Sequence, residues 1–319
     1  MQSWLYMGAG FGLLFLGGEW LVRGAARVAL RLGLSPLLIG LTVVAFGTSS
    51  PELFVSLKAV LTGHGGIATG NVVGSNIANV GLILGVCAMV FPLRVALQVL
   101  RVDLPVLLVV SALFWLLLRD GVLDRAEAAA LVLCLAAYLL VQVRLARRGV
   151  TPEITREFDQ ALPRPARHPA VDVALIAGGL ASLVVGGRLL VTGAVDLARA
   201  AGVSESVIGL TMVAVGTSLP ELAASLVAAW RREGDIAVGN IVGSNLFNLL
   251  AVAGTCGLVA PLDAQGVTAF DFGIMLALVI IVLPLMWSGF TLHRWEGAVL
   301  LLCYAGYIGY VVWRAGVPG

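Results

Sequence analysis

Two glutamates, Glu52 and Glu221, are the residues of this chain whose type and surroundings best suit chemistry. Each follows a proline inside an otherwise apolar run, and each run belongs to one of two copies of a motif, residues 40–85 and 209–254. Without a gap, the copies match at 25 of 46 positions, always at an offset of 169. Two such carboxylates, one from each half of the chain, are what we expect the protein to work with.

Oxygen atoms surround each glutamate, whereas arginine and lysine are absent from the motif core. A threonine lies four residues before each glutamate, on the same helical face, and a serine follows that threonine. These hydroxyl residues are Thr48, Ser49, Thr217 and Ser218. The prolines have no N–H, so each leaves a carbonyl four residues earlier, that of Gly47 or Gly216, without its helical partner. At membrane depth, such carbonyls are tolerated only where they line a cavity or meet a ligand.

The second part of each copy adds serine and asparagine at helical spacing. These residues are Ser75, Asn79, Ser244 and Asn248, with Gly70, Gly74, Gly239 and Gly243 beside them. A serine and an asparagine four residues apart share one helical face, and small residues at this spacing let membrane helices approach closely. We expect the polar atoms to point inward, where the asparagines either bind a ligand or join helices by hydrogen bonds.

An ionised carboxylate at membrane depth costs several kcal/mol, so each glutamate must be protonated, paired with an arginine or bound to a cation. Arg23 or Arg188 could reach in from the first segment of either half. Carboxylates, hydroxyls, amide oxygens and carbonyls are hard ligands that suit Ca²⁺ and Na⁺, whereas softer metals would require cysteine or histidine. Two carboxylates neutralise one divalent ion or two monovalent ions, so the pattern predicts competition for one site, which is exchange.

Other functions fit the same residues less well. Protonated carboxyls that bridge helices would not explain why a proline, a Thr-Ser pair and a Ser/Asn pair recur in both copies. An intramembrane hydrolase would need a base beside its serine, and no His or Lys is placed to serve, so we expect no enzyme. A channel would need a continuous open path, and the sequence leaves that alternative open. The cysteines lie in apolar runs and are interpreted as small buried hydrophobes: Cys87, Cys134, Cys256 and Cys303.

The composition places these motifs in a membrane. Hydrophobic residues make up 60% of the chain and charged residues only 12%, outside the range of soluble domains. Apolar runs long enough to cross a bilayer recur throughout, and we interpret the first of them as a spanning helix and not a removable signal. About ten transmembrane segments are expected, near residues 4–30, 36–61, 67–92, 101–119, 126–146, 170–199, 205–230, 236–261, 270–289 and 295–314.

The repeat extends beyond the motif, so segments one to five correspond to six to ten. We expect a first repeat at residues 1–146, a polar linker at 147–169 and a second repeat at 170–319. Because five is odd, the second repeat must cross the membrane in the opposite sense, the inverted topology found in many secondary transporters. The predicted fold is therefore an all-α membrane protein of two inverted five-helix repeats with broken helices at the ion site. Arginines cluster at the linker side, which predicts a cytoplasmic linker and both termini outside.

The motifs GTSSPEL and GTSLPEL, followed by GNVVGSN and GNIVGSN, resemble the two α-repeats of the calcium/cation antiporter superfamily, and most of all its prokaryotic sodium/calcium exchanger branch. The resemblance covers nearly the whole chain apart from the linker and the extreme ends. It implies an alternating-access antiporter that moves Ca²⁺ against Na⁺, with the long first and sixth helices sliding as the gating pair.

Position by position, the resemblance also implies the ligands. Ca²⁺ and Na⁺ would share Glu52 and Glu221, and the carbonyls of Thr48 and Thr217 would complete the Ca²⁺ site. The central and flanking Na⁺ ligands would be Asn79, Asn248, Ala45, Ser49, Ser75, Ala214, Ser218 and Ser244. Some members have an aspartate at the place of Asn248, whereas both central positions are asparagine here, so the expected site has two carboxylates and no third.

The sequence thus predicts a Na⁺/Ca²⁺ exchanger of a bacterial-type plasma membrane, with Ca²⁺ and Na⁺ as substrates and the bilayer as its surroundings. No cofactor, nucleic acid or protein partner is implied. Because the third carboxylate is missing, a Ca²⁺/H⁺ antiporter on the same scaffold is the main alternative, and an uncoupled cation channel is a weaker one.

Overall fold

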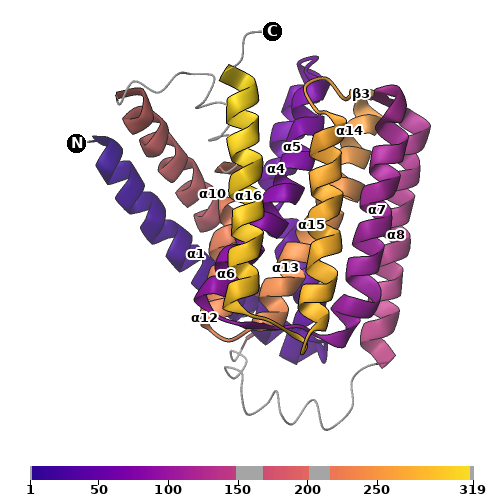
Figure 1. Ribbon diagram of the computed structural model, residues 1–319. Helices are drawn as coiled ribbons and strands as arrows, with labels where there is room; N and C mark the ends of the chain where they lie inside the picture. Colours follow the sequence, from indigo (N-terminus) through magenta and orange to yellow (C-terminus); the bar gives the residue numbers. More distant parts are fainter. Residues whose placement is uncertain (1, 149–167, 201–215, 317–319) are drawn as a thin grey trace.

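The computed structural model describes residues 2–148, 168–200 and 216–316, which form a bundle of long helices (Figure 1). The elements of the first half are α1 Gln2–Leu32, α2 Pro36–Ile39, η1 Gly40–Val44, α3 Ala45–Thr48, α4 Ser50–Leu61, α5 Gly65–Ala78, η2 Asn79–Leu84, α6 Gly85–Val90, β1 Leu93–Arg94, η3 Val99–Asp103, α7 Leu104–Leu117, η4 Leu118–Asp120, β2 Val122–Leu123 and α8 Arg125–Arg148. Those of the second half are α10 Pro169–Ala200, α12 Leu219–Trp230, α13 Gly234–Phe247, η5 Asn248–Val252, α14 Ala253–Val259, β3 Leu262–Asp263, α15 Ala269–Trp287, β4 Thr291–Leu292 and α16 Arg294–Gly316.

Eight helices of the described residues are long and apolar enough to cross a membrane, and a bent pair, 36–48 with 50–61, makes a ninth span. The sequence-predicted segments coincide with these helices, and the seventh, 205–230, is described only in its second part, which contains α12. The expected linker, 147–169, lies almost wholly outside the described residues. The prediction of an all-helical, multi-pass membrane protein is confirmed.

Two small β-ribbons tie the halves together and display their symmetry. β1 pairs with β4 in antiparallel register, Leu93 opposite Leu292, and β2 pairs with β3, Leu123 opposite Leu262. Adding 169 to Leu93 and Leu123 gives Leu262 and Leu292, so the two ribbons are images of each other across the repeat. Each half therefore supplies one strand to both ribbons, an arrangement that the sequence pattern did not predict.

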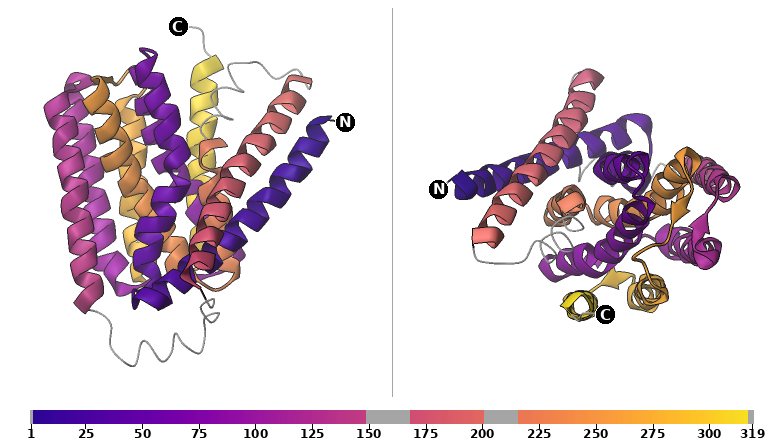
Figure 2. Two further views of the ribbon diagram at one scale, coloured as in Figure 1. Left: turned by 180° about the vertical axis from the view of Figure 1, so that it is seen from behind. Right: turned by 90° about the horizontal axis from the view of Figure 1, so that it is seen from above.

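The long helices α1 and α10 lie side by side and tilt away from the other helices at the end that carries the N-terminus (Figure 2). Glycines at seven-residue spacing line their shared seam: Gly10, Gly17, Gly24, Gly179, Gly186 and Gly193. A Cβ added at Gly17 would lie 2.8 Å from the carbonyl oxygen of Gly179, and one at Gly10 would lie 2.8 Å from that of Gly186. As positions rise along α1 their partners fall along α10, so the repeat-related helices run antiparallel, as inverted topology requires.

Ion pairs join α1 to its neighbours near its C-terminal end and near its middle. The Arg31 guanidinium binds the buried carboxylate of Asp172 on α10, with Nη2 at 2.9 Å from Oδ2, and Arg27 lies 3.7 Å from the other oxygen. Glu19 of α1 binds Arg231, which follows α12, and also binds Arg23. Close backbone contact and the ion pairs of the buried Asp172 carboxylate hold α1 and α10 together.

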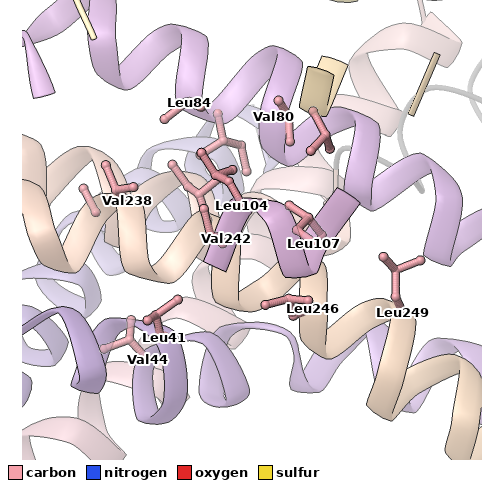
Figure 3. Packing of buried hydrophobic residues seen from close by; sticks show 14 of the residues in the cluster. Leu41, Val44, Val80, Leu84, Leu104, Leu107, Val238, Val242, Leu246 and Leu249 are labelled. Atoms are coloured by element: carbon pink, nitrogen blue, oxygen red, sulfur yellow. The ribbon is translucent and has the colours of Figure 1, made fainter. Parts of the chain in front are cut away.

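The helices that carry the second half of each motif form the centre of the bundle. In the spans 65–90 and 234–259, 78% and 94% of the most apolar window is buried inside the chain, against 17% in α16. Val238, Val242 and Leu246 of α13 belong to one buried cluster with Leu104 and Leu107 of the first half (Figure 3). The outer helices leave apolar side chains exposed for lipid. Cys134 on α8 is one of the exposed positions, which corrects its interpretation as buried.

Candidate ion-binding site

Both glutamates occupy the first turn of a helix that restarts inside the bundle. Ser49 and Ser218 leave the helical conformation, with ψ of 4° and 5°, and α4 and α12 begin at the next residue. The helices on either side of Ser49 meet at a bend of 42°. The predicted helix break is therefore present. It lies at Ser49 and Ser218, two residues before each proline, and not at Gly47 and Gly216. A helix N-terminus presents free N–H groups and positive potential, which favour a carboxylate there.

The two carboxylates come from opposite repeats and meet at one place. Glu52 is 1% exposed and Glu221 is 0% exposed. The Ser49 hydroxyl donates to Glu221 Oε1 at 2.8 Å, and the Ser218 hydroxyl donates to Glu52 Oε1 at 3.2 Å. Each serine thus binds the glutamate of the other repeat, which brings the two carboxylates into one region of the bundle. The serine of each Thr-Ser-x-Pro-Glu motif therefore contacts the glutamate of the other motif, so each repeat supplies part of the other's carboxylate environment.

Arginine does not neutralise these carboxylates within the part of the chain that the structure describes. The ion pairs there are made by Glu19 and Asp172. Arg23, which the sequence offered as a candidate partner, binds Glu19. The site therefore holds two buried acids at one place, without a basic side chain between them.

Six of the ten buried oxygens that lack a hydrogen-bond partner in the described chain belong to residues that the sequence singled out; the other four are on Asn76, Asp103, Ser111 and Asp172. The six are Glu52 Oε2, Glu221 Oε2, Ser75 Oγ, Ser244 Oγ, Asn79 Oδ1 and Asn248 Oδ1. Leaving one buried polar atom without a hydrogen bond costs about 1–3 kcal/mol. Six such oxygens on the predicted site residues therefore indicate a binding site for a ligand. The set is hard oxygen, which matches Ca²⁺ or Na⁺. No trio of His, Cys, Asp or Glu gathers elsewhere in the described chain to hold a metal.

The central asparagines stand where their helices change winding. α5 passes into the π-helical turn η2 at Asn79, and α13 passes into η5 at Asn248. Such π-bulges are frequent at functional sites. The Asn79 amide donates to Asn245 Oδ1 at 3.0 Å, so one central asparagine is held by the opposite repeat. The sequence did not predict these turns, because a π-bulge has no local composition signal of its own.

The remaining predicted ligands differ in what the structure says of them. Thr48 is fully buried and Ala45 is 1% exposed, at the start of α3. The Ala45 carbonyl already accepts from the Ser49 N–H at 3.0 Å, and the Thr48 hydroxyl lies 3.4 Å from it. Ala214 lies outside the described residues.

Four polar residues that sequence reasoning missed line the same region, two in each repeat. They are Asn71, Ser56, Asn240 and Ser225. The available signal was their identity in both copies and their spacing. Asn71 lies four residues before Ser75, on the face that Ser75 and Asn79 were predicted to share.

A family model described as "Sodium/calcium exchanger protein" matches residues 2–144 and again residues 171–313. The chain is 39% identical to the inner membrane protein YrbG of Escherichia coli over 96% of its own length and 94% of that protein. It is 34% identical to the sodium/calcium exchanger MaX1 of Methanosarcina acetivorans, over 93% and 95% of the two chains. A solved structure of the sodium-calcium exchanger NCX_Mj aligns with a TM-score of 0.83 at 30% identity, covering 97% of this chain and 99% of that one.

Proposed function

Because the chain belongs to the sodium/calcium exchanger family, we propose that it is an antiporter that moves Ca²⁺ against Na⁺ across a membrane by alternating access. One observation carries the proposal beyond the family: two buried glutamates from opposite repeats converge without a basic partner among the described residues. Their second oxygens have no hydrogen-bond partner there. A cation is the species that would satisfy them, and the transported ions are substrates, with no cofactor required.

The proposed Ca²⁺ ligands are the carboxylates of Glu52 and Glu221 and the carbonyls of Thr48 and Thr217. The proposed central and flanking Na⁺ ligands are Ala45, Ala214, Ser49, Ser218, Ser75, Ser244, Asn79 and Asn248. The unpartnered oxygens of Ser75, Ser244, Asn79 and Asn248 support this assignment. For Ala45 the support is weaker, because its carbonyl already accepts the Ser49 N–H.

Exchange follows from charge balance at the shared carboxylates. Two negative charges are neutralised by one Ca²⁺ or by two Na⁺, and binding both kinds of ion at once would leave uncompensated positive charge in a buried site. The ions therefore compete, and each leaves only when the other replaces it. The paired helices α1 and α10, joined by backbone contact and by Asp172, are the unit that we propose slides to open the site to either side.

We place the protein in a plasma (inner) membrane as two five-helix repeats, residues 1–146 and 170–319. The linker at 147–169 would be cytoplasmic and both termini outside, because the excess of arginine lies on the linker side.

The two central asparagines support a second candidate function, Ca²⁺/H⁺ exchange. Asn79 and Asn248 leave the site with two carboxylates, so two monovalent charges already balance it, and protons could supply them. Ca²⁺/H⁺ exchange on the same scaffold is therefore the second candidate.

The deciding experiment uses the purified chain in sealed vesicles. Ca²⁺ uptake is followed under an outward Na⁺ gradient without a pH difference, and then under a pH gradient without Na⁺. We expect uptake with the Na⁺ gradient alone. Uptake with the pH gradient alone would establish Ca²⁺/H⁺ exchange, and Ca²⁺ flux without either gradient would indicate a channel.

A further inference from the structure

Asn71 and Asn240 make the same hydrogen bonds in mirror image, and each reaches from its own repeat into the other. The Asn71 amide donates to Ser56 Oγ at 2.9 Å and to the Glu52 carbonyl at 3.3 Å. Its oxygen accepts from the Thr217 hydroxyl at 3.4 Å. Asn71 thus joins the helix that carries one glutamate to the threonine beside the other.

The second repeat repeats this arrangement. The Asn240 amide donates to Ser225 Oγ at 2.9 Å and lies 3.5 Å from the Glu221 carbonyl. Its oxygen accepts from the Thr48 hydroxyl at 3.1 Å. Asn71 is 7% exposed and Asn240 is fully buried, so both amides make these hydrogen bonds inside the bundle.

A carboxamide is well suited to this task because its oxygen and its NH₂ group lie in one rigid plane. The acceptor end is fixed to a threonine of one repeat, and the donor end is fixed to the glutamate-bearing helix of the other. The distance between those two groups is therefore set by a single planar side chain. Neither amide places an atom among the unpartnered oxygens of the ion site.

We propose that Asn71 and Asn240 are positioning residues that set the place of the Thr217 and Thr48 main chains, and thereby the discrimination of Ca²⁺ from Na⁺. The inference rests on the proposed function, in which the threonine carbonyls bind Ca²⁺ and other groups bind the flanking Na⁺ ions. Ca²⁺ requires its oxygens at about 2.3–2.6 Å. Without the hydrogen bonds to Asn240 and Asn71, the Thr48 and Thr217 carbonyls would no longer be held at that distance from Ca²⁺. The proposed Na⁺ ligands on serine would be less affected.

The test compares ion affinities of the full-length protein in detergent. Thr48→Val and Thr217→Val remove only the hydroxyl and keep the carbonyl, and Asn71→Leu and Asn240→Leu remove the amide. Dissociation constants for Ca²⁺ and for Na⁺ are taken from the rise of the thermal unfolding midpoint with each ion. We expect Ca²⁺ affinity to fall about tenfold in each variant, the order of effect of one lost buried hydrogen bond, with Na⁺ affinity nearly unchanged.

A matched control lies on the same helix as Asn71. Thr69 is fully buried, and its hydroxyl donates to the Asp263 carbonyl at 2.7 Å, away from the glutamates. Thr69→Val should lower the unfolding midpoint as the other threonine variants do, without changing the ratio of Ca²⁺ to Na⁺ affinity.

Double variants give the sharper test, because the structure fixes which pairs touch. Thr48 contacts Asn240 and Thr217 contacts Asn71, so these doubles should weaken Ca²⁺ binding little more than one substitution does. The exchanged doubles, Thr48 with Asn71 and Thr217 with Asn240, should show clearly larger combined losses.

Equal losses in both kinds of double variant, or Ca²⁺ and Na⁺ affinities that fall together, would overturn the inference. If the asparagine variants do not fold, the threonine variants decide alone: unchanged Ca²⁺ affinity in both would overturn it. Absence of Ca²⁺ binding by the unsubstituted chain would instead overturn the proposed function, which distinguishes the two failures.

Discussion

At the scale of single residues, the site depends on two acids that a membrane interior would otherwise exclude. Glu52 and Glu221 are buried, each accepts one hydroxyl from the opposite repeat, and each keeps one oxygen unpartnered among the described residues. Asp172, a structural carboxyl, is neutralised by the Arg31 guanidinium, whereas neither glutamate has a basic partner among the described residues. The glutamates are therefore better explained as ligands than as bridges between helices.

Replacing either glutamate should separate transport from folding. Glu52→Gln or Glu221→Gln removes one of the two charges that balance Ca²⁺, so we expect exchange in vesicles to fall by at least about 100-fold, the effect of roughly 3 kcal/mol. The unfolding midpoint without Ca²⁺ should stay the same or rise, because repulsion between two buried acids is removed.

Glu127→Gln is the control for this pair. Glu127 accepts the Asp124 N–H at the start of α8, away from the site, and glutamine can cap in the same position. Exchange should persist in that variant. Full exchange in either site variant would contradict the ligand assignment, and a chain that no longer folds would favour the bridging role.

Glu233, in the turn between α12 and α13, should make stability depend on pH. Burial and the nearby Asp235 carboxylate raise the pKa of Glu233 from 4.5 to about 7, although Arg231 opposes the shift. The folded chain therefore keeps a proton that the unfolded chain loses, and stability should fall as pH rises from 4.5 to 7 and stay level above. Thermal unfolding of Glu233→Gln should show a shallower decline over this pH range, and an unchanged decline in that variant would contradict the assignment.

At the scale of elements, the seam between α1 and α10 should tolerate no added side chain. A Cβ at Gly17 would lie 2.8 Å from the Gly179 carbonyl oxygen and 2.9 Å from the Leu183 nitrogen, both of them backbone atoms. Gly17→Ala must push the helices apart, and we expect a loss of about 1–3 kcal/mol, as for overpacked cores, together with impaired exchange.

Gly12 on the same helix provides the comparison. A Cβ there would have no other atom within 4 Å, and alanine favours a helix by up to about 1 kcal/mol over glycine. Gly12→Ala should therefore leave exchange intact and raise the unfolding midpoint slightly. Equal behaviour of the two variants in thermal unfolding and vesicle uptake would show that the seam is not a close contact.

At the scale of the whole molecule, the sequence predicted the internal repeat and the apolar membrane-spanning segments. The offset of 169 predicted two equivalent halves, and the solved fold of NCX_Mj matches the resulting architecture with a TM-score of 0.83. The glutamates, the neighbouring serines and the central asparagines were found because they interrupt apolar runs twice. Their pairing was not predicted, because the contacts of Ser49 with Glu221 and of Ser218 with Glu52 join residues about 170 positions apart.

Other features could not be read from local pattern at all. The π-helical turns at Asn79 and Asn248, the exchanged β-ribbons and the amide bridges of Asn71 and Asn240 arise from packing between repeats. Asn71 and Asn240 were nevertheless identical in the two copies. The presence of the same polar residue in both copies of an apolar repeat therefore indicates the site better than its distance in sequence from a glutamate does.

The central claim is that one cation is held jointly by acids from both repeats, and diffraction from crystals soaked in Ca²⁺ tests it most directly. We predict one anomalous peak between the two glutamates, with an oxygen of Glu52 and one of Glu221 each at roughly 2.3–2.6 Å, and loss of that peak after a soak in high Na⁺. A Ca²⁺ peak that touches only one repeat, or one that persists in saturating Na⁺, would contradict the account.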